Sequence, residues 1–205
     1  MPHLAAQLRA AAIQRGVLGA SVNLSVGEAV RIVRDLPYQR ASDRRPETVI
    51  EEWRGTCSGK HYLLAQVLEE LGAGVMLIHA THHFTEENSP WLPADLLDEV
   101  RRAPVPDIHT FLRVQLDAFR DEWFTVDATW PLAAQALGMP VNEGFRHGDD
   151  HNIAADVEEI IHVDEDDDPQ AVKDALIAAF VGDEAPRRDA FIERLSAWLG
   201  ERLAG

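Results

Sequence analysis

The chain has a single cysteine, Cys57, among its 205 residues. One cysteine excludes an intramolecular disulfide, and it excludes any zinc site that takes two or more cysteine ligands from this chain. A lone cysteine without disulfides suits a reducing compartment, which favours a cytoplasmic location. The residue is either a small buried hydrophobe or a thiol with a chemical role, and the surrounding sequence decides between the two.

Long apolar runs are also missing. No stretch approaches the ~20 consecutive apolar residues that a membrane-spanning helix needs. The segment 1–15 lacks the charged start and apolar centre of a signal peptide, because Arg9 and Gln14 interrupt it. We therefore expect a cytoplasmic protein that has no membrane partner.

Basic residues are scarce relative to acidic ones. The chain has 19 lysines and arginines against 35 aspartates and glutamates, which gives a formal net charge of -16. A chain this acidic repels phosphate backbones and anionic lipid surfaces, so we expect no nucleic-acid partner and favour neutral or cationic substrates. A hydrophobic fraction of 46% and a charged fraction of 26% are ordinary for a globular protein and argue against disorder.

The hydrophobic pattern predicts helices before and after a set of antiparallel strands, without regular alternation of strand and helix. Helices are expected at about 4–14, 25–35, 47–53, 57–71, 94–102, 131–137, 169–181 and 186–203. Strands are expected at about 75–79, 108–116, 123–126 and, at a sheet edge, 157–163. This order predicts an α+β fold. We expect one domain over 1–205, with a catalytic core at about 47–130 and a C-terminal helical extension at about 164–205.

Several polar segments have ordinary structural interpretations. The segment 84–107 contains four prolines and is interpreted as an insertion over the surface, such as a lid. The acidic run 164–168 lacks the alternating ligands and internal glycine of a calcium loop, which favours a solvated linker. Lys60 and His61 follow the cysteine inside its predicted helix and are expected to face solvent.

Two groups of histidines have spacings that a metal site can use. One is His79, His82 and His83, and the other is His147 and His151 with Asp149 and Asp150. The first group has no carboxylate partner at helical spacing, and the second is typical of a solvated loop. We therefore predict neither a metal nor a cofactor.

Cys57 lies at the predicted start of the clearest amphipathic helix. Gly55 and Thr56 precede it, so the turn into the helix is tight and easily capped. Free N–H groups and the positive dipole end at a helix N-terminus favour thiolate over thiol. The same N–H groups can stabilise an oxyanion on an attacked carbonyl. This position therefore suits a nucleophile.

His109 begins one arm of the predicted hairpin, Asp127 ends the other, and both are equally far from Ala118. If the connection is odd-numbered and centred on Ala118, the two side chains face each other with Cβ atoms ~4.5–5.5 Å apart. An even-numbered loop would make the pair diagonal. The carboxylate then holds one imidazole nitrogen while the other faces the thiol. Singly, each residue has an ordinary structural interpretation, but together Cys57, His109 and Asp127 predict a catalytic triad.

Three segments resemble the transglutaminase-like superfamily. The sequence from Gly55 to Cys57, followed by an apolar helix and Gly72, resembles the nucleophile segment of that superfamily. The segments 108–114 and 123–129 resemble its histidine and aspartate strands. The resemblance covers about 53–130, under half of the chain.

This resemblance implies a papain-like core, in which a helix carrying Cys57 packs on an antiparallel sheet carrying His109 and Asp127, with helices flanking the core on both sides. It also implies acyl chemistry on amides through a thioester, as in transglutaminases, proteases and amidases. We expect a cysteine hydrolase or acyltransferase that acts on a peptide, a protein or a small amide. The alternative is a catalytically silent binding or scaffold module, since some members lack catalysis.

The sequence departs from the superfamily pattern beside the triad. Thr110 and Phe111 stand where a small residue and a tryptophan are common after the histidine, and Ala128 replaces a common proline after the aspartate. Both departures alter the expected pocket wall. Three aromatic residues, Trp53, Trp130 and Phe111, are predicted to contact substrate.

Two further alternatives follow from other segments. The segment 54–57 also resembles arylamine N-acetyltransferases, which use the same triad, but the chain is short for that family. It also lacks the second glycine and the acidic residue expected around the cysteine. A third hypothesis gives the acidic C-terminal helices a separate partner-binding role, in which case removal of 164–205 would leave the thiol reactive.

Overall fold

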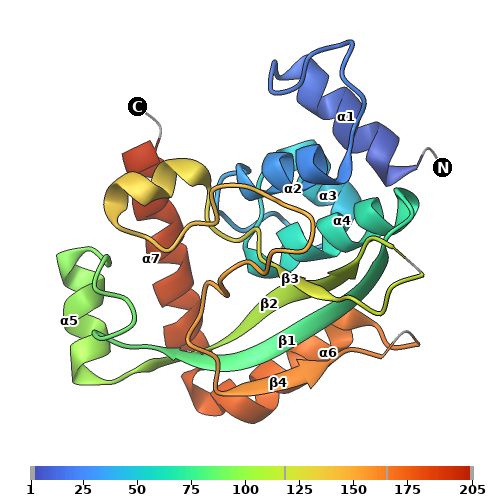
Figure 1. Ribbon diagram of the computed structural model, residues 1–205. Coiled ribbons are helices and arrows are strands. Elements are labelled where there is room, and N and C mark those ends of the chain that lie inside the picture. The colour runs from blue at the N-terminus through green and yellow to red at the C-terminus, as the bar shows by residue number, and fades with distance from the viewer. Residues whose placement is uncertain (1–2, 118, 165, 204–205) are drawn as a thin grey trace.

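The computed structural model describes residues 3–117, 119–164 and 166–203, and helices cover one antiparallel sheet of the order β3-β2-β1-β4 (Figure 1). The strands are β1 (Gly74–Phe84), β2 (Val105–Gln115), β3 (Phe124–Val126) and β4 (Glu159–His162). The α-helices are α1 (Leu4–Gln14), α2 (Val26–Arg34), α3 (Pro46–Glu52), α4 (Cys57–Glu70), α5 (Ala94–Arg102), α6 (Pro169–Leu176) and α7 (Ala185–Leu203). Shorter helical turns cover Leu132–Leu137, Ile177–Val181 and Gly182–Glu184. The predicted α+β class is confirmed.

The main hydrophobic core lies between the N-terminal helices and the sheet. Leu63, Leu64 and Leu68 of α4 are fully buried and belong to one apolar cluster with Leu112 of β2 and Val126 of β3. Burial of each such side chain contributes about 1.5–3 kcal/mol, so this seam fixes α4 against the sheet. The first residue of α4 therefore has a defined position beside β2.

A second core occupies the region predicted to be a surface insertion. β1 extends to Phe84, α5 covers Ala94–Arg102, and β2 begins at Val105. Much of the segment 84–107 is therefore regular structure. Leu96 of α5 is fully buried in a cluster that includes Phe191 of α7. The segment is a packed connection between the two central strands, because its apolar residues find partners on the C-terminal helix.

The short strand β3 leaves part of β2 without a strand on that side. Leu112 pairs with Val126, and the three residues of β3 pair only with 112–114 among the described residues. Thr110 Oγ1 instead lies 3.5 Å from Ser58 Oγ at the start of α4. The N-terminus of α4 therefore approaches β2 just beyond the end of β3.

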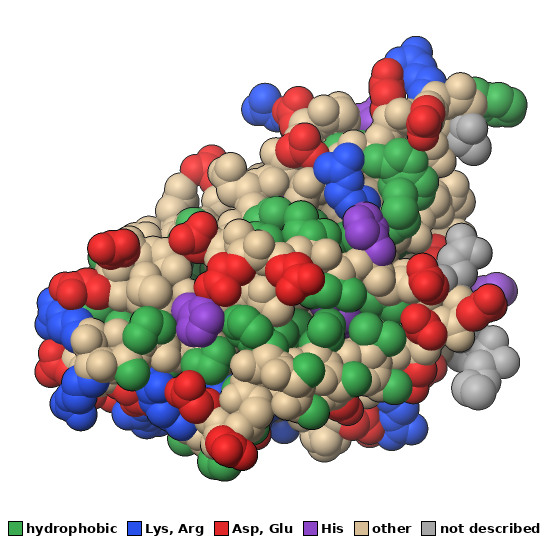
Figure 2. All heavy atoms as spheres, turned by 90° about the horizontal axis from the view of Figure 1, so that it is seen from below, with side chains coloured by type: hydrophobic (Ala, Val, Ile, Leu, Met, Phe, Trp, Pro, Cys, Tyr) green, Lys and Arg blue, Asp and Glu red, His purple; other side chains and the backbone are tan. Residues whose placement is uncertain are grey.

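Acidic side chains are distributed across the face of the molecule seen in Figure 2, rather than gathered in one patch. This agrees with the net charge of -16. None of the helices in the described part of the chain has the length and apolar composition to cross a membrane.

Candidate active site

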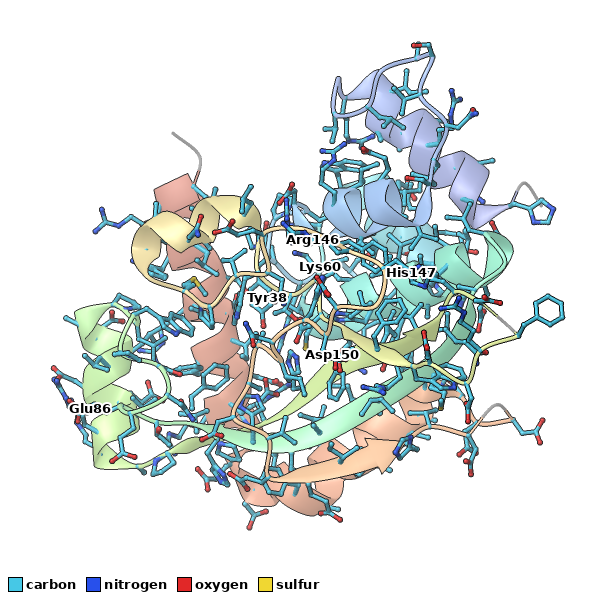
Figure 3. All side chains as sticks on the ribbon, viewed as in Figure 1. Tyr38, Lys60, Glu86, Arg146, His147 and Asp150 are labelled. Carbon is cyan, nitrogen blue, oxygen red and sulfur yellow. The ribbon has the colours of Figure 1, made fainter. Side chains whose placement is uncertain are left out.

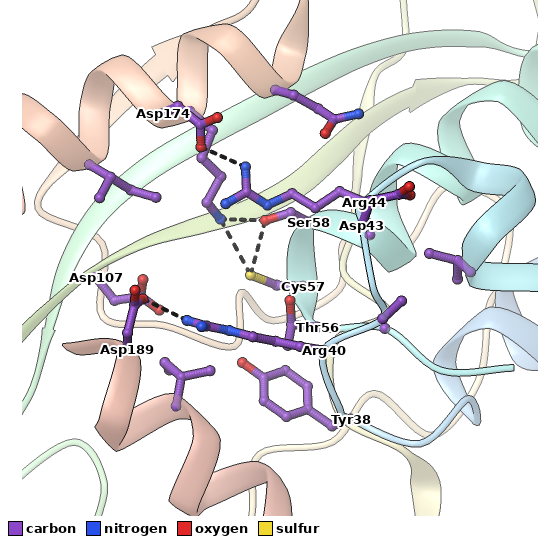
Figure 4. A pocket seen from close by; sticks show the side chains of 18 of the residues that line it. Tyr38, Arg40, Asp43, Arg44, Thr56, Cys57, Ser58, Asp107, Asp174 and Asp189 are labelled. Atoms are coloured by element: carbon purple, nitrogen blue, oxygen red, sulfur yellow. Dashed lines mark hydrogen bonds and ion pairs between the residues drawn. The ribbon is translucent and has the colours of Figure 1, made fainter. Parts of the chain in front are cut away.

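A cavity of about 420 Å³ opens at the N-terminus of α4, and Cys57 forms part of its wall (Figure 4). The thiol is nearly buried, since Cys57 is only 4% exposed. The loop before α3, the start of α4, and helices α6 and α7 all contribute lining residues. The cavity is thus built from segments far apart in the sequence.

His109 and Asp127 form a direct hydrogen bond beside this thiol. His109 Nε2 lies 2.8 Å from Asp127 Oδ2, and both side chains are buried. This leaves the other imidazole nitrogen, Nδ1, available to the thiol of Cys57, and each of the two groups shifts the pKa of the other. The structure therefore brings the three predicted residues together in the order thiol, imidazole, carboxylate.

The register that joins this pair differs from the expected one. Leu112 pairs with Val126, so continuing the ladder by one residue would place Asp127 opposite Phe111 rather than His109. The pair is therefore diagonal. The connection between the paired residues of β2 and β3 has an odd number of residues, but its centre lies one position later than Ala118. Ala118 itself lies outside the described residues. A shift of two residues keeps a side chain on the same face of a strand, so the hydrogen bond still forms.

Backbone donors hold Asp127 in place. Its Oδ1 accepts from the N–H of Thr129 at 3.0 Å, and its Oδ2 accepts from the N–H of Ala154 at 2.8 Å. Burial opposes ionisation, but the charge and hydrogen bond of His109 outweigh it and hold the pKa of Asp127 well below its usual range. The carboxylate is therefore a fixed anion that orients the imidazole.

The thiol and imidazole favour their charged forms. Burial raises the pKa of Cys57, but the charge of Lys173 and the hydrogen bond and charge of His109 bring that pKa down to about 6. Burial lowers the pKa of His109, but the charge and hydrogen bond of Asp127, with contributions from Cys57, raise it to about 10. Between these values the site holds a thiolate beside an imidazolium.

Lys173 of α6 is a residue of the site that the sequence did not reveal. It is 1% exposed, and its Nζ lies 3.7 Å from Cys57 Sγ and 2.5 Å from Ser58 Oγ. The same Nζ donates to the carbonyl of Ile108 at 2.6 Å and to Thr110 Oγ1 at 3.1 Å. A lysine 116 residues after the nucleophile has no local pattern that connects the two. Its position also argues against a separable role for 164–205.

Lys60 and His61 are buried rather than solvent-facing, which corrects the expectation for both residues; Figure 3 shows Lys60 in the interior. Lys60 Nζ donates to the carbonyls of Arg34 and Thr129, each at 2.9 Å. His61 Nε2 accepts from the N–H of Ala128 at 2.9 Å, so its Nδ1 donates to the Cys57 carbonyl at 2.7 Å. These bonds tie the start of α4 to the loop after β3, because the buried backbone groups there need partners.

Ion pairs cross the cavity on both sides of the thiol (Figure 4). Arg40 pairs with Asp189 of α7 at 2.7 Å, and Arg44 pairs with Asp174 of α6 at 2.7 Å. Deeper in the wall, Arg188 Nε donates to Asp107 Oδ1 at 2.7 Å. Each of these cations is matched by an anion.

The three aromatic residues predicted to contact substrate are not among the described residues that line this cavity. Trp53 lies at the end of α3 with a positive φ of 54°, and the Arg15 guanidinium stacks over its ring at 4.6 Å. Phe111 is buried among apolar residues on the sheet. Trp130 is buried behind Tyr38, with ring centroids 4.5 Å apart. Tyr38 lines the cavity instead, and it is a residue that the sequence did not single out.

The histidine groups have partners of other kinds. His79 bonds to Thr110 Oγ1 and to the Pro169 carbonyl, each at 3.1 Å. His83 bonds to Glu158 at 2.6 Å. Within the described part of the chain, no group of three or more histidine, cysteine or acidic side chains is arranged to hold a metal ion.

No family model matches the chain, and no curated protein or solved structure matches it either. The functional interpretation therefore depends on the residues and geometry described above.

Proposed function

We propose that this chain is a cysteine-dependent enzyme that hydrolyses or transfers acyl groups from amides, on a papain-like core of transglutaminase-like type. One observation carries the proposal: Cys57, nearly buried in the wall of a cavity, lies close enough to His109 for that imidazole to act on its pKa, and His109 Nε2 bonds to Asp127 Oδ2 at 2.8 Å. A nucleophile, a base and an orienting carboxylate in this order are the components of nucleophilic acyl transfer.

Acylation uses the charged forms of the pair. The Cys57 thiolate attacks the carbonyl carbon, a C–S bond forms, and the oxygen becomes an oxyanion. The first N–H groups of α4 have no partner inside the helix, and Cys57 and Ser58 both line the cavity, so we assign these N–H groups to the oxyanion. The imidazolium of His109 then gives its Nδ1 proton to the leaving amine, the C–N bond breaks, and a thioester remains on Sγ.

Tyr38 supplies a second donor for the oxyanion in this proposal. Its side chain lines the same cavity as Cys57 (Figure 4), and the charge of Cys57 acts on its hydroxyl. Burial, followed by the charges of Cys57 and Asp107, raises the pKa of Tyr38 well above its usual value, so the hydroxyl keeps its proton and remains a donor.

Deacylation reverses the proton movement. Neutral His109 takes a proton from water or from an acceptor amine, which attacks the thioester carbon. The C–S bond breaks, and its electron pair returns to Sγ as a thiolate. Every step uses side chains and backbone groups of this chain.

The cavity suits a neutral amide group. Its lining has four cationic side chains, Arg40, Arg44, Lys173 and Arg188, and four anionic ones, Asp43, Asp107, Asp174 and Asp189. This balance favours no net charge at the reacting group, whereas the acidic surface favours a neutral or cationic substrate as a whole. The substrate class is therefore a peptide, a protein or a small amide.

Trapping of the acyl-enzyme tests the proposal. The protein is mixed with p-nitrophenyl acetate at pH 7 and quenched in acid, and its intact mass and peptide map are recorded. We expect one acetyl group on Cys57, which added hydroxylamine removes, and none on His109→Ala. Acetylation confined to lysines, with Cys57 unmodified, would contradict the proposal and favour a silent binding module.

A further inference from the structure

Lys173 has an unusual environment for a lysine, since its ammonium group is enclosed by oxygen acceptors. Three oxygens lie within 3.1 Å of Nζ: the carbonyl of Ile108, Oγ1 of Thr110 and Oγ of Ser58. A carbonyl oxygen can only accept, so Nζ must donate to Ile108. Burial lowers the pKa of Lys173, and these acceptors, together with the charges of Cys57 and Asp107, oppose that effect and favour the charged form.

The anionic partner of this ammonium is the nucleophile. Cys57 Sγ lies 3.7 Å from Nζ. Asp107 also faces Lys173, but Arg188 holds that carboxylate. The charged and titratable groups that face Lys173 come from five parts of the chain: Cys57 of α4, Asp107 and His109 of β2, His79 and His82 of β1, Arg188 of α7, and Arg44 of the loop before α3. Among these, only the thiolate is an anion not already held by a guanidinium.

We propose that Lys173 is a catalytic residue, a fixed cation that holds the Cys57 thiolate while His109 moves the proton. This inference rests on the proposed function and adds a fourth member to its machinery. His109 must lose and regain a proton in each cycle, so its charge disappears when the leaving amine departs. The ammonium of Lys173 donates to three oxygens and takes no part in that proton transfer, so in this mechanism a cation lies beside Sγ whenever the thiolate is present.

The separate roles of Lys173 and His109 matter most when the thioester breaks. As water or an amine attacks, the C–S electron pair returns to Sγ, and His109 is taking a proton at the same time. Lys173 is then the cation already in place for the departing thiolate. A nearby fixed positive charge stabilises a developing anion without reorganisation, which lowers the barrier to its departure.

The test is the rate of Cys57 alkylation by iodoacetamide from pH 4 to 10 for wild type and variants. Lys173→Met and Lys173→Gln remove the charge, and Lys173→Arg keeps it. Lys60→Met is the matched control, because Lys60 is equally buried but bonds to carbonyls on the other side of α4. We expect Met and Gln at position 173 to slow alkylation at pH 5 by about tenfold, since a rise of one pKa unit lowers the thiolate fraction tenfold at a pH below both pKa values.

Lys173→Arg should retain most of the reactivity at pH 5, and Lys60→Met should retain the wild-type profile. Folded Lys173→Met and Lys173→Gln proteins that titrate like wild type would overturn the inference and leave the proposed function standing. A wild-type thiol that titrates near the free value of about 8.5 would instead count against the proposed function itself.

A measurement on the unmutated protein tests the inference even where the variants at position 173 do not fold. Alkylation of Cys57 removes the thiolate charge, so the pKa of Lys173 should fall when the thiol is blocked. Carbon-13 NMR of the lysine Cε atoms before and after alkylation reports this pKa. A Lys173 titration that is the same in both forms would overturn the inference.

Discussion

Two polar clusters lie on the first turns of α4, and they differ in what surrounds them. On one side, Cys57 and Ser58 face a cavity and the ammonium of Lys173. On the other side, Lys60 and His61 are enclosed by backbone groups of α2 and of the loop after β3. Both clusters contain a buried lysine, but only the first has a reactive atom and open space beside it.

The difference shows what separates a structural polar cluster from a chemical one. Lys60 finds only carbonyl acceptors, and burial lowers its pKa to about 7. Burial lowers the pKa of Lys173 as well, but its ammonium contacts hydroxyls, a carbonyl and the thiol of Cys57. Burial of charge is costly on both sides. On the Lys60 side the interaction joins two segments of backbone, and on the Lys173 side we propose that it keeps the thiol of Cys57 ionised.

Replacement of Cys57 by alanine should have the largest effect on turnover. The loss should be confined to the chemistry of the cavity side and leave the stability of the fold unchanged. Turnover of p-nitrophenyl acetate above background should fall by roughly 10⁴-fold or more, because no other side chain supplies the nucleophile. The urea midpoint of unfolding should stay close to wild type, since the bonds of Lys60 and His61 remain. A variant that retained substantial turnover would place the chemistry elsewhere.

Asp127 connects the two sides, since its Oδ2 bonds to His109 and its Oδ1 lies 3.8 Å from His61 Nε2. Asp127→Asn should lower turnover by roughly 10³-fold, because the imidazole loses its orienting carboxylate. The pKa of His109 should drop from about 10, since the charge that raises it is gone. Proton NMR of the imidazole, compared with His109→Gln for assignment, measures this shift, and an unmoved titration would break the proposed pairing.

Tyr38→Phe tests the cavity side without touching the thiol. Loss of one oxyanion donor should lower kcat by about 10²-fold with little change in KM. The rate of iodoacetamide alkylation should be unchanged, because that reaction forms no oxyanion. Equal losses in both assays would show that Tyr38 acts on the thiol and not on the carbonyl.

Ser58→Ala should have a smaller effect on the reactivity of Cys57. Ser58 Oγ accepts from Lys173 and lies 3.9 Å from Cys57 Sγ. Its removal leaves Lys173 with the Ile108 carbonyl, Thr110 and the thiol as partners. Alkylation at pH 6 should slow by about two- to fivefold, the kinetic equivalent of up to ~1 kcal/mol for one hydrogen bond. A tenfold or larger loss would assign Ser58 a direct role at the thiol.

Lys60→Met should have the smallest effect on reactivity and a clear effect on stability. The pKa of Lys60 is about 7 in the folded protein and about 10.4 in an unfolded chain. The unfolded state therefore binds more protons between these values, so Lys60 lowers wild-type stability as the pH falls from 10 to 7. Unfolding free energies at both pH values should show this loss, roughly 3 kcal/mol, in wild type relative to Lys60→Met. Identical pH dependence in both proteins would contradict it.

The sequence predicted the triad because its signals are local. Gly55 and Thr56 mark the start of the nucleophile helix, and the two hairpin arms carry His109 and Asp127. The exact register was beyond reach, because it depends on the geometry of the connection around Ala118 rather than on its residue types. Helices and strands with clear periodicity lie close to their predicted bounds, apart from the two long central strands, whose ends fall in a proline-containing segment.

The rest of the site depends on contacts between distant segments. Lysines are rarely buried, so neither Lys60 nor Lys173 had a pattern that predicted its position. Trp53 is close to Cys57 in sequence but turns away at the end of α3, where it packs under Arg15. Trp130 forms part of a core behind Tyr38. The sequence therefore predicted that Cys57, His109 and Asp127 lie together, but not which residues form the walls of the cavity.

The ionisation of Cys57 is the most direct test of the proposed acyl chemistry and of the role of Lys173. Thiolate absorbance near 240 nm is recorded from pH 4 to 10 for wild type, and the same titration of Cys57→Ala is subtracted. We expect a midpoint near pH 6, because Lys173 and His109 together outweigh the burial of the thiol. A midpoint near the free value of about 8.5 would show that the thiolate is not stabilised, and it would contradict both the proposed acyl chemistry and the role of Lys173.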